Sequence, residues 1–141
     1  MIPNSCIKIE TTKFPILEGE KDEIVNENMY GKAVCNYLEK ELPKENIEVP
    51  FYCNEDWGWW LEVKSNDFSM GLCIYSDPDV TDSPESYAIM PSEHNAKKWY
   101  WSKFKTLDIS KDVLLVMETV ANIFKKDKEI LKVSQHNDFP Y

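Results

Sequence analysis

Glycine and histidine are scarce in this sequence, and their scarcity excludes several kinds of catalytic site. Only four glycines occur among 141 residues. Phosphate-binding loops and dinucleotide fingerprints need glycines at fixed spacings, and neither pattern is present. The two histidines, His94 and His136, have no partner four residues away, and no Gly-x-Ser-x-Gly elbow occurs. We therefore expect a protein without enzymatic activity and without a cofactor.

Metal ligands are also poorly arranged. None of the four cysteines, Cys6, Cys35, Cys53 and Cys73, belongs to a Cys-x-x-Cys pair. Cysteines spaced so broadly among apolar neighbours are typical of small buried side chains. The acids of residues 77–82 depart from a calcium loop, because the third spacing is wrong and no glycine follows. We expect no bound metal.

Long apolar runs are missing, and basic residues are outnumbered. No stretch approaches the 18 or so apolar residues that span a bilayer, and residues 1–14 lack the pattern of a secretory signal. We therefore expect a cytoplasmic protein that does not enter membranes. The sequence contains 16 basic residues and 25 acids, which give a formal net charge of −9. Such acidity disfavours nucleic acid and favours a basic protein partner.

The densest feature is the stretch Glu55-Asp56-Trp57-Gly58-Trp59-Trp60. Because strand side chains alternate between faces, Trp59 shares an apolar face with Leu61 and Val63, and Trp60 lies on the opposite, mixed face. Two interpretations remain open. All three indoles belong to the core, or one indole and one acid line a binding cleft.

The remaining patterns predict an α+β fold in a single domain, residues 1–141. We predict a mainly antiparallel sheet with two amphipathic helices packed on one face. The expected strands are 5–12, 47–52, 59–64, 68–75, 87–90 and 97–104, and the pair 59–64 and 68–75 forms a hairpin. The expected helices are 29–42, capped by Asn28, and a second that begins at Asp108 or Ser110. The second helix has an apolar stripe that includes Val113, Val116, Met117, Val120 and Phe124 and is expected to face the core. Residues 130–133 extend that helix or form a last strand, and residues 18–23 and 76–86 form solvated acidic loops.

Two functional hypotheses follow. In the first, the chain is a small acidic protein-binding module that uses exposed aromatic anchors. In the second, Trp57, Trp60, Trp99 and Trp101 line a pocket for a small molecule or sugar, with Glu55 or Asp56 orienting the ligand. The candidate binding residues are Glu55, Asp56, Trp57, Trp60, Trp99, Trp101, Asp77 and Asp79.

The segments Gly31-Lys32-Ala33, Leu38 and Glu55-Asp56-Trp57-Gly58-Trp59 resemble those of a set of small uncharacterised bacterial proteins. That resemblance covers about a third of the chain and implies a compact cytosolic α+β protein. In size and charge the chain is also similar to immunity proteins, which neutralise basic toxin domains by covering them. The similarity implies that the basic partner is a toxin or an enzyme.

Overall fold

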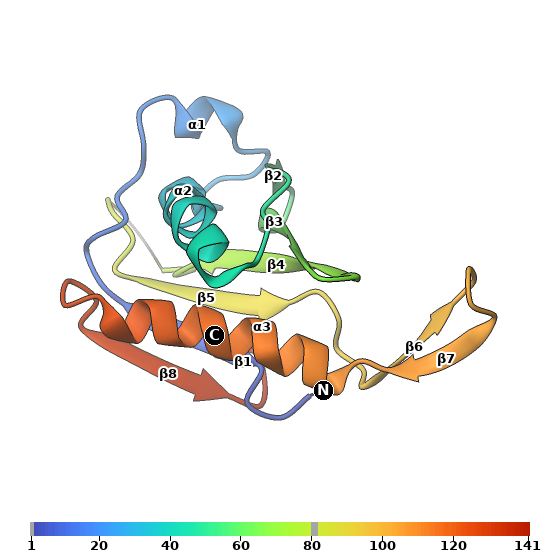
Figure 1. Cartoon of the computed structure of the whole chain (residues 1–141). Coiled ribbons are helices and arrows are strands. Elements are labelled where there is room, and N and C mark those ends of the chain that lie inside the picture. The colour runs from blue at the N-terminus through green and yellow to red at the C-terminus, as the bar shows by residue number, and fades with distance from the viewer. Residues whose placement is uncertain (1, 80–81) are drawn as a thin grey trace.

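Across residues 2–79 and 82–141, which the computed structural model describes, the chain forms a six-stranded sheet, a separate two-stranded sheet and several helices (Figure 1). The elements are β1 (Cys6–Glu10), α1 (Glu20–Glu23), α2 (Lys32–Glu41), the 3-10 helix η1 (Leu42–Glu45), β2 (Tyr52–Glu55), β3 (Gly58–Ser65), β4 (Phe68–Ser76), β5 (Ser86–Pro91), β6 (Lys97–Tyr100), β7 (Lys105–Asp108), α3 (Ser110–Lys126) and β8 (Lys132–His136). The main sheet has the order β2-β3-β4-β5-β1-β8, and all its pairs are antiparallel. The predicted α+β class is confirmed.

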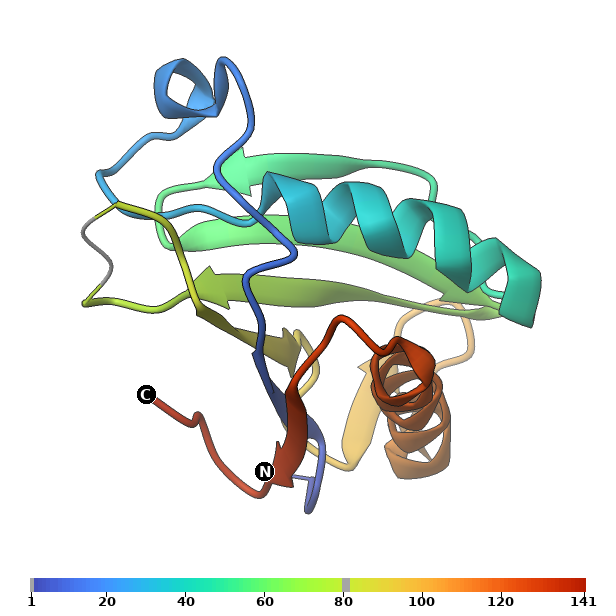
Figure 2. The ribbon, with the colours of Figure 1, turned by 90° about the vertical axis from the view of Figure 1, so that its left-hand side faces the viewer.

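The two longer helices cover one face of the main sheet. The predicted stripe of α3, which includes Val113, Val116 and Phe124, is buried, as are Val34 and Leu38 of α2. These side chains form one apolar core with the sheet residues Ile7, Ile9, Leu61, Leu72, Ile74 and Ile89. Figure 2 shows α2 lying along β3 and β4, with α3 beside the other half of the sheet. Burial of this single face supplies the main stabilisation of the fold.

The predicted central hairpin is confirmed as β3 and β4. Trp59 pairs with Ile74, and Val63 pairs with Met70. On the helix-covered face, Trp59, Leu61 and Val63 are all buried. Their neighbours point to the opposite face, where Trp60 and Glu62 are half-buried and Lys64 is exposed. The period-two pattern therefore assigned both faces of this strand correctly.

The strand before this hairpin was predicted too early. Residues 47–52 were expected to form it, but β2 begins at Tyr52 and includes residues assigned to the turn. Only Asp56 and Trp57 separate β2 from β3, since Glu55 already pairs with Gly58. Proline has no N–H to donate, so Pro50 delays the regular ladder. Upstream of it, Glu48 still exchanges two backbone hydrogen bonds with Lys64, at 2.8 and 2.9 Å.

Residues 97–104 do not form the single predicted strand of the main sheet. Lys97–Tyr100 and Lys105–Asp108 pair with each other as β6 and β7. The turn between them ends at Phe104, whose φ of 48° is left-handed. We call residues 96–108 the arm, because this hairpin projects from the molecule in Figure 1. For residues 130–133 the strand alternative is correct in part, since β8 runs from Lys132 to His136 beside β1.

The start of α2 is held by a side chain that is distant in sequence. The predicted cap, Asn28, lies outside the helix, and Gly31 occupies the N-cap position without any side-chain cap of its own. Instead, Oε2 of Glu20 accepts hydrogen bonds from the N–H groups of Gly31, at 2.9 Å, and Lys32, at 3.0 Å. Its Oε1 accepts from the N–H of Leu17 at 3.0 Å. A carboxylate here satisfies helix donors and complements the helix dipole.

Glu20 also corrects the prediction that residues 18–23 are a solvated connection. Its side chain is fully buried, whereas Glu18 beside it is exposed. The segment contains the short helix α1, which turns Glu20 inward. The other predicted acidic loop lies between β4 and β5, and its residues 80–81 fall outside the described residues.

We expect Glu20→Ala to lower the free energy of unfolding by about 1–3 kcal/mol, because it leaves buried N–H groups without an acceptor. Urea denaturation at pH 7 measures the effect. The exposed Glu18→Ala variant is the matched control and is expected to change stability by less than about 0.5 kcal/mol. Equal midpoints for the two variants would show that Glu20 does not hold α2.

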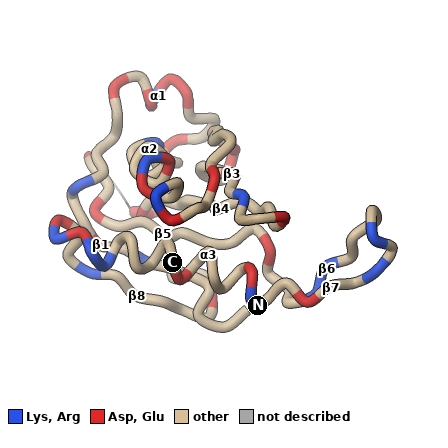
Figure 3. Tube along the Cα trace, viewed as in Figure 1, with Lys and Arg blue, Asp and Glu red and all other residues tan. Residues whose placement is uncertain are grey.

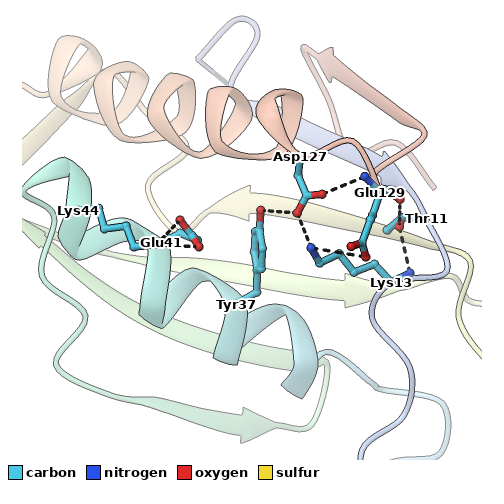
Figure 4. Close-up of polar contacts among 7 residues, drawn as sticks. All are labelled: Thr11, Lys13, Tyr37, Glu41, Lys44, Asp127 and Glu129. Atoms are coloured by element: carbon cyan, nitrogen blue, oxygen red, sulfur yellow. Dashed lines mark hydrogen bonds and ion pairs between the residues drawn. The ribbon is translucent and has the colours of Figure 1, made fainter.

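A second polar cluster joins the end of α3 to β1 and α2 (Figure 4). The carboxylate of Asp127 accepts hydrogen bonds from Lys13, from the Tyr37 hydroxyl at 2.9 Å and from the Glu129 N–H at 2.9 Å. Burial raises the pKa of Asp127, but these hydrogen bonds outweigh that effect and lower its pKa below the ordinary value. Burial and the same contact raise the pKa of Tyr37.

The depressed pKa of Asp127 predicts a stability difference that depends on pH. Since the folded pKa lies below the unfolded value, the contribution is complete above the unfolded pKa of about 3.9 and is lost as pH falls through the folded pKa. Asp127→Asn should therefore destabilise the protein at pH 7, by about 1–3 kcal/mol. Urea titrations from pH 7 to pH 2.5 measure both chains. If the difference in free energy of unfolding between the two chains stayed constant down to pH 2.5, the lowered pKa of Asp127 would be contradicted.

Candidate interaction site

Trp59, the middle indole of the tryptophan stretch, belongs to the core. It is buried on the helix-covered face, and its Nε1 donates a hydrogen bond to the Met29 carbonyl at 3.0 Å. Gly31 at the start of α2 allows this contact, since a Cβ there would lie 2.9 Å from Cδ1 of Trp59. The core interpretation is therefore correct for this one tryptophan.

Trp60 lies on the opposite face of the sheet and covers a small second cluster. Its indole packs with the buried side chains of Cys6, Cys73 and Met90. Its Nε1 donates to Oε1 of Glu62 at 3.1 Å, which leaves the ring half-buried. Burial raises the pKa of the Cys73 thiol to about 12, so this cysteine stays protonated and unreactive at neutral pH.

Trp57 opens an aromatic row that the sequence did not reveal. Its ring contacts Tyr75 at 5.2 Å between centroids, Tyr75 contacts Phe139 at 4.8 Å, and Phe139 contacts Tyr141 at 5.8 Å. We call the cavity beside these rings the aromatic pocket. Its volume is about 380 Å³, within the range of ligand pockets, and it is lined by Glu27, Asn28, Met29, Trp57, Tyr75, Ser76, Pro78, Phe139 and Tyr141.

The C-terminal tail forms one wall of the aromatic pocket, and specific contacts hold it there. The Tyr141 hydroxyl lies 2.7 Å from Oγ of Ser86, and Nζ of Lys8 lies 5.2 Å from the centre of its ring. Burial raises the pKa of Tyr141 to about 12. At the start of the tail, Oδ1 of Asn137 accepts from the N–H of Asn4 at 3.0 Å. Sequence reasoning made no use of the tail, although its alternating Phe139 and Tyr141 were the available signal.

One acid, Glu27, lines this pocket, and three more acids directly adjoin lining residues in the chain. We call Glu27, Asp56, Asp77 and Asp79 the acidic rim. Glu27 lines the pocket, and Asp77 lies between the lining residues Ser76 and Pro78. Asp56 directly precedes Trp57, and its carbonyl accepts from the side chain of Asn26, which joins two of the segments. Asp79 turns back so that its N–H donates to Oδ1 of Asp77 at 2.9 Å.

Three of the predicted site residues, Asp56, Asp77 and Asp79, thus adjoin the lining of the pocket, and a fourth, Trp57, lines it. Glu55 lies one residue earlier, at the end of β2, where Oε1 is 3.6 Å from the Cys53 sulfur. It does not line the aromatic pocket. Asp77 and Asp79 are far from Asp56 in the sequence, but the fold brings all three to the same end of the molecule.

The four predicted tryptophans do not line one pocket. Trp57 lies beside the aromatic pocket and Trp60 covers the second cluster, whereas Trp99 and Trp101 belong to the arm. On the arm their rings meet each other at 5.7 Å and meet Phe104 at 6.4 and 6.3 Å. The predicted pocket of Trp57, Trp60, Trp99 and Trp101 is wrong because β6 pairs only with β7 in its own sheet.

One Ser–His contact occurs, but its surroundings differ from those of a catalytic pair. Oγ of Ser134 lies 2.8 Å from Nε2 of His136. Both residues belong to β8, an edge strand, and residues two apart on a strand share a face. Neither lines the aromatic pocket. Within residues 2–79 and 82–141, no group of three His, Cys, Asp or Glu side chains is placed to hold a metal ion.

Comparisons with known protein families, curated proteins and solved structures gave no significant match to this chain. In the described part of the chain, no helix combines the length and apolar character needed to cross a membrane. The fold and the site therefore define an α+β chain with an acid-rimmed aromatic pocket.

We expect Gly71→Ala to displace Trp60. A Cβ on Gly71 would lie 2.3 to 2.5 Å from three carbons of the indole, which must move away. Overpacking of this kind costs about 1–3 kcal/mol in the free energy of unfolding. Chemical denaturation measures the loss, and tryptophan emission should shift as the ring becomes more exposed. Ser69→Ala, at an exposed position of the same strand and face, is the control and should leave both unchanged.

Proposed function

We propose that this chain is a non-enzymatic binding protein whose acidic end receives a basic protein partner, as an immunity-type protein receives the toxin or enzyme that it neutralises. The observation that carries the proposal is the acidic rim around the aromatic pocket. Protein interfaces concentrate binding energy in aromatic anchors and desolvated pockets. Complementary charges around them speed association and select the partner.

The composition of this end supports a basic partner. Residues 17–28, 54–57 and 76–86 contain eleven acids and one lysine. Figure 3 shows acidic residues gathered along the segment that carries α1. A lysine or arginine of the partner could place its charge against the rim and its methylene stem on Trp57 or Tyr75, since long basic side chains pack well on aromatic rings.

A photo-crosslinking amino acid at the exposed position Asp79 tests the proposal in the source cell. We expect it to capture a specific basic protein, and the same group at Glu39, an exposed position of α2, is the control. A purified 1:1 complex then permits calorimetry. Trp57→Ala should weaken binding at least about tenfold, and Asp56→Asn with Asp79→Asn should slow association and reduce its salt dependence.

Crosslinking only at the control position, or capture of an acidic protein other than a second copy of this chain, would contradict this function. So would a complex whose dissociation constant is unchanged in both the Trp57→Ala and the rim variants.

A small-molecule or carbohydrate ligand is the second candidate, because the aromatic pocket is concave and lined by rings. Calorimetry with a panel of sugars, nucleotides and amines distinguishes the two. Saturable binding of one such compound, lost in Trp57→Ala while no protein is captured, would favour the small molecule.

A further inference from the structure

The arm has the opposite charge to the rest of the chain. Residues 96–108 contain four lysines and one acid, Asp108, a formal charge of +3, so the remaining residues carry −12 within the overall −9. Figure 3 shows these lysines along the β6–β7 hairpin. The basic residues of the arm are Lys97, Lys98, Lys103 and Lys105.

The outer face of the arm is an exposed aromatic cluster. Trp99, Trp101 and Phe104 are 43%, 75% and 76% exposed, and their rings touch one another edge to face. Aromatic residues this exposed are costly in water unless a partner covers them. A contiguous group of aromatic side chains with charged residues around it is typical of an interaction surface.

The inner face of the arm packs against the rest of the protein and holds the arm in place. Tyr100 packs against the main core, and the ammonium groups of Lys98 and Lys103 lie over its ring at 5.7 and 5.8 Å. The Ile109 N–H donates to the Ala96 carbonyl at 2.6 Å and closes the base of the hairpin. The outer cluster is therefore presented on a fixed support, which lowers the entropic cost of binding.

The aromatic pocket has the complementary chemistry. Four aromatic rings and the carboxylate of Glu27 line it, the other three rim acids adjoin lining residues in the chain, and no lysine is among the lining residues. The arm of the same chain does not fill it, since the pocket's lining contains no arm residue. In Figure 2 the C-terminus and the loop after β4 lie at the left, whereas the arm lies behind the right half of the molecule. Any contact between the two must come from another chain.

We propose that the arm of one copy enters the aromatic pocket of a second copy, with Trp101 against Trp57 and Tyr75 and the arm lysines against the acidic rim. The inference rests on the proposed function in that both use the acidic end as a binding site. In a dimer with two-fold symmetry, each arm enters the pocket of the other copy, so the contact is made twice. Self-association would then close the pocket until a stronger basic partner displaces the arm.

Analytical ultracentrifugation of the purified chain from about 1 to 500 µM tests the proposal. We expect a reversible dimer that weakens between 50 and 500 mM salt, because screening reduces the attraction between arm and rim. Trp101→Ser and Trp57→Ala should each raise the dissociation constant at least about tenfold. Phe51→Ser is the matched control, since Phe51 is an aromatic residue, 51% exposed, that belongs neither to the arm nor to the lining of the aromatic pocket, and it should leave the dimer unchanged.

Two further measurements make the contact specific. A mixture of Trp101→Ser and Trp57→Ala chains should form more heterodimer than either variant forms homodimer, since one intact arm then meets one intact pocket. Lys103→Glu with Lys105→Glu should abolish self-association, and Asp56→Lys with Asp79→Lys on the other chain should restore it. Restoration also shows that both variants are folded.

A monomer at every concentration would overturn the proposal, as would a dimer indifferent to both tryptophan variants. Sedimentation of the monomer with phosphatidylserine vesicles, lost in Trp101→Ser, would assign the arm to an anionic lipid surface instead. The proposed function is judged separately, because capture of a basic partner at Asp79 is measured with the Trp101→Ser chain. That chain retains the pocket whether or not two copies associate.

Discussion

The close approach of two indoles to backbone is the constraint on which the architecture depends. Trp59 lies against Gly31 on the helix-covered face, and Trp60 lies against Gly71 on the other. Neither approach is possible with a Cβ in place, so the central hairpin determines where α2 begins and how the second face is covered. Large aromatic side chains bury much surface. Two neighbouring tryptophans, Trp59 and Trp60, therefore supply much of the packing on the two faces of β3.

The two faces of the sheet then have different roles. One carries the helices and the main core, as an α+β layer arrangement requires. Among the described residues, the other face carries a small cluster of Cys6, Cys73 and Met90, against which Trp57, Trp60 and Tyr75 pack, and the tail residue Phe139 contacts Tyr75. A sheet face without a helix leaves its edges and loops accessible. The aromatic pocket forms there, where the tail, the start of β3 and the loop after β4 meet.

The charge distribution follows the same division of the molecule. Eleven of the 25 acids lie in residues 17–28, 54–57 and 76–86 at the pocket end, whereas the arm is basic and aromatic. Net charge alone would describe the chain as uniformly acidic. The acidic pocket end and the basic arm each favour a partner of opposite charge. The reason is that the electrostatic field at a protein surface acts over about a Debye length rather than over the whole molecule.

The class of fold, the central hairpin and the buried stripe of α3 could be predicted from the sequence, because alternation and helical periodicity report which face of an element meets the core. The sequence also marked Trp57 and Asp56 as neighbours, since they adjoin in the chain. Three features depend on the folding of distant segments onto one another: Glu20 caps α2, Phe139 and Tyr141 complete a pocket with Trp57, and Trp99 and Trp101 lie elsewhere on an arm. These features join residues far apart in the chain, and local patterns carry no information about which distant segments come into contact.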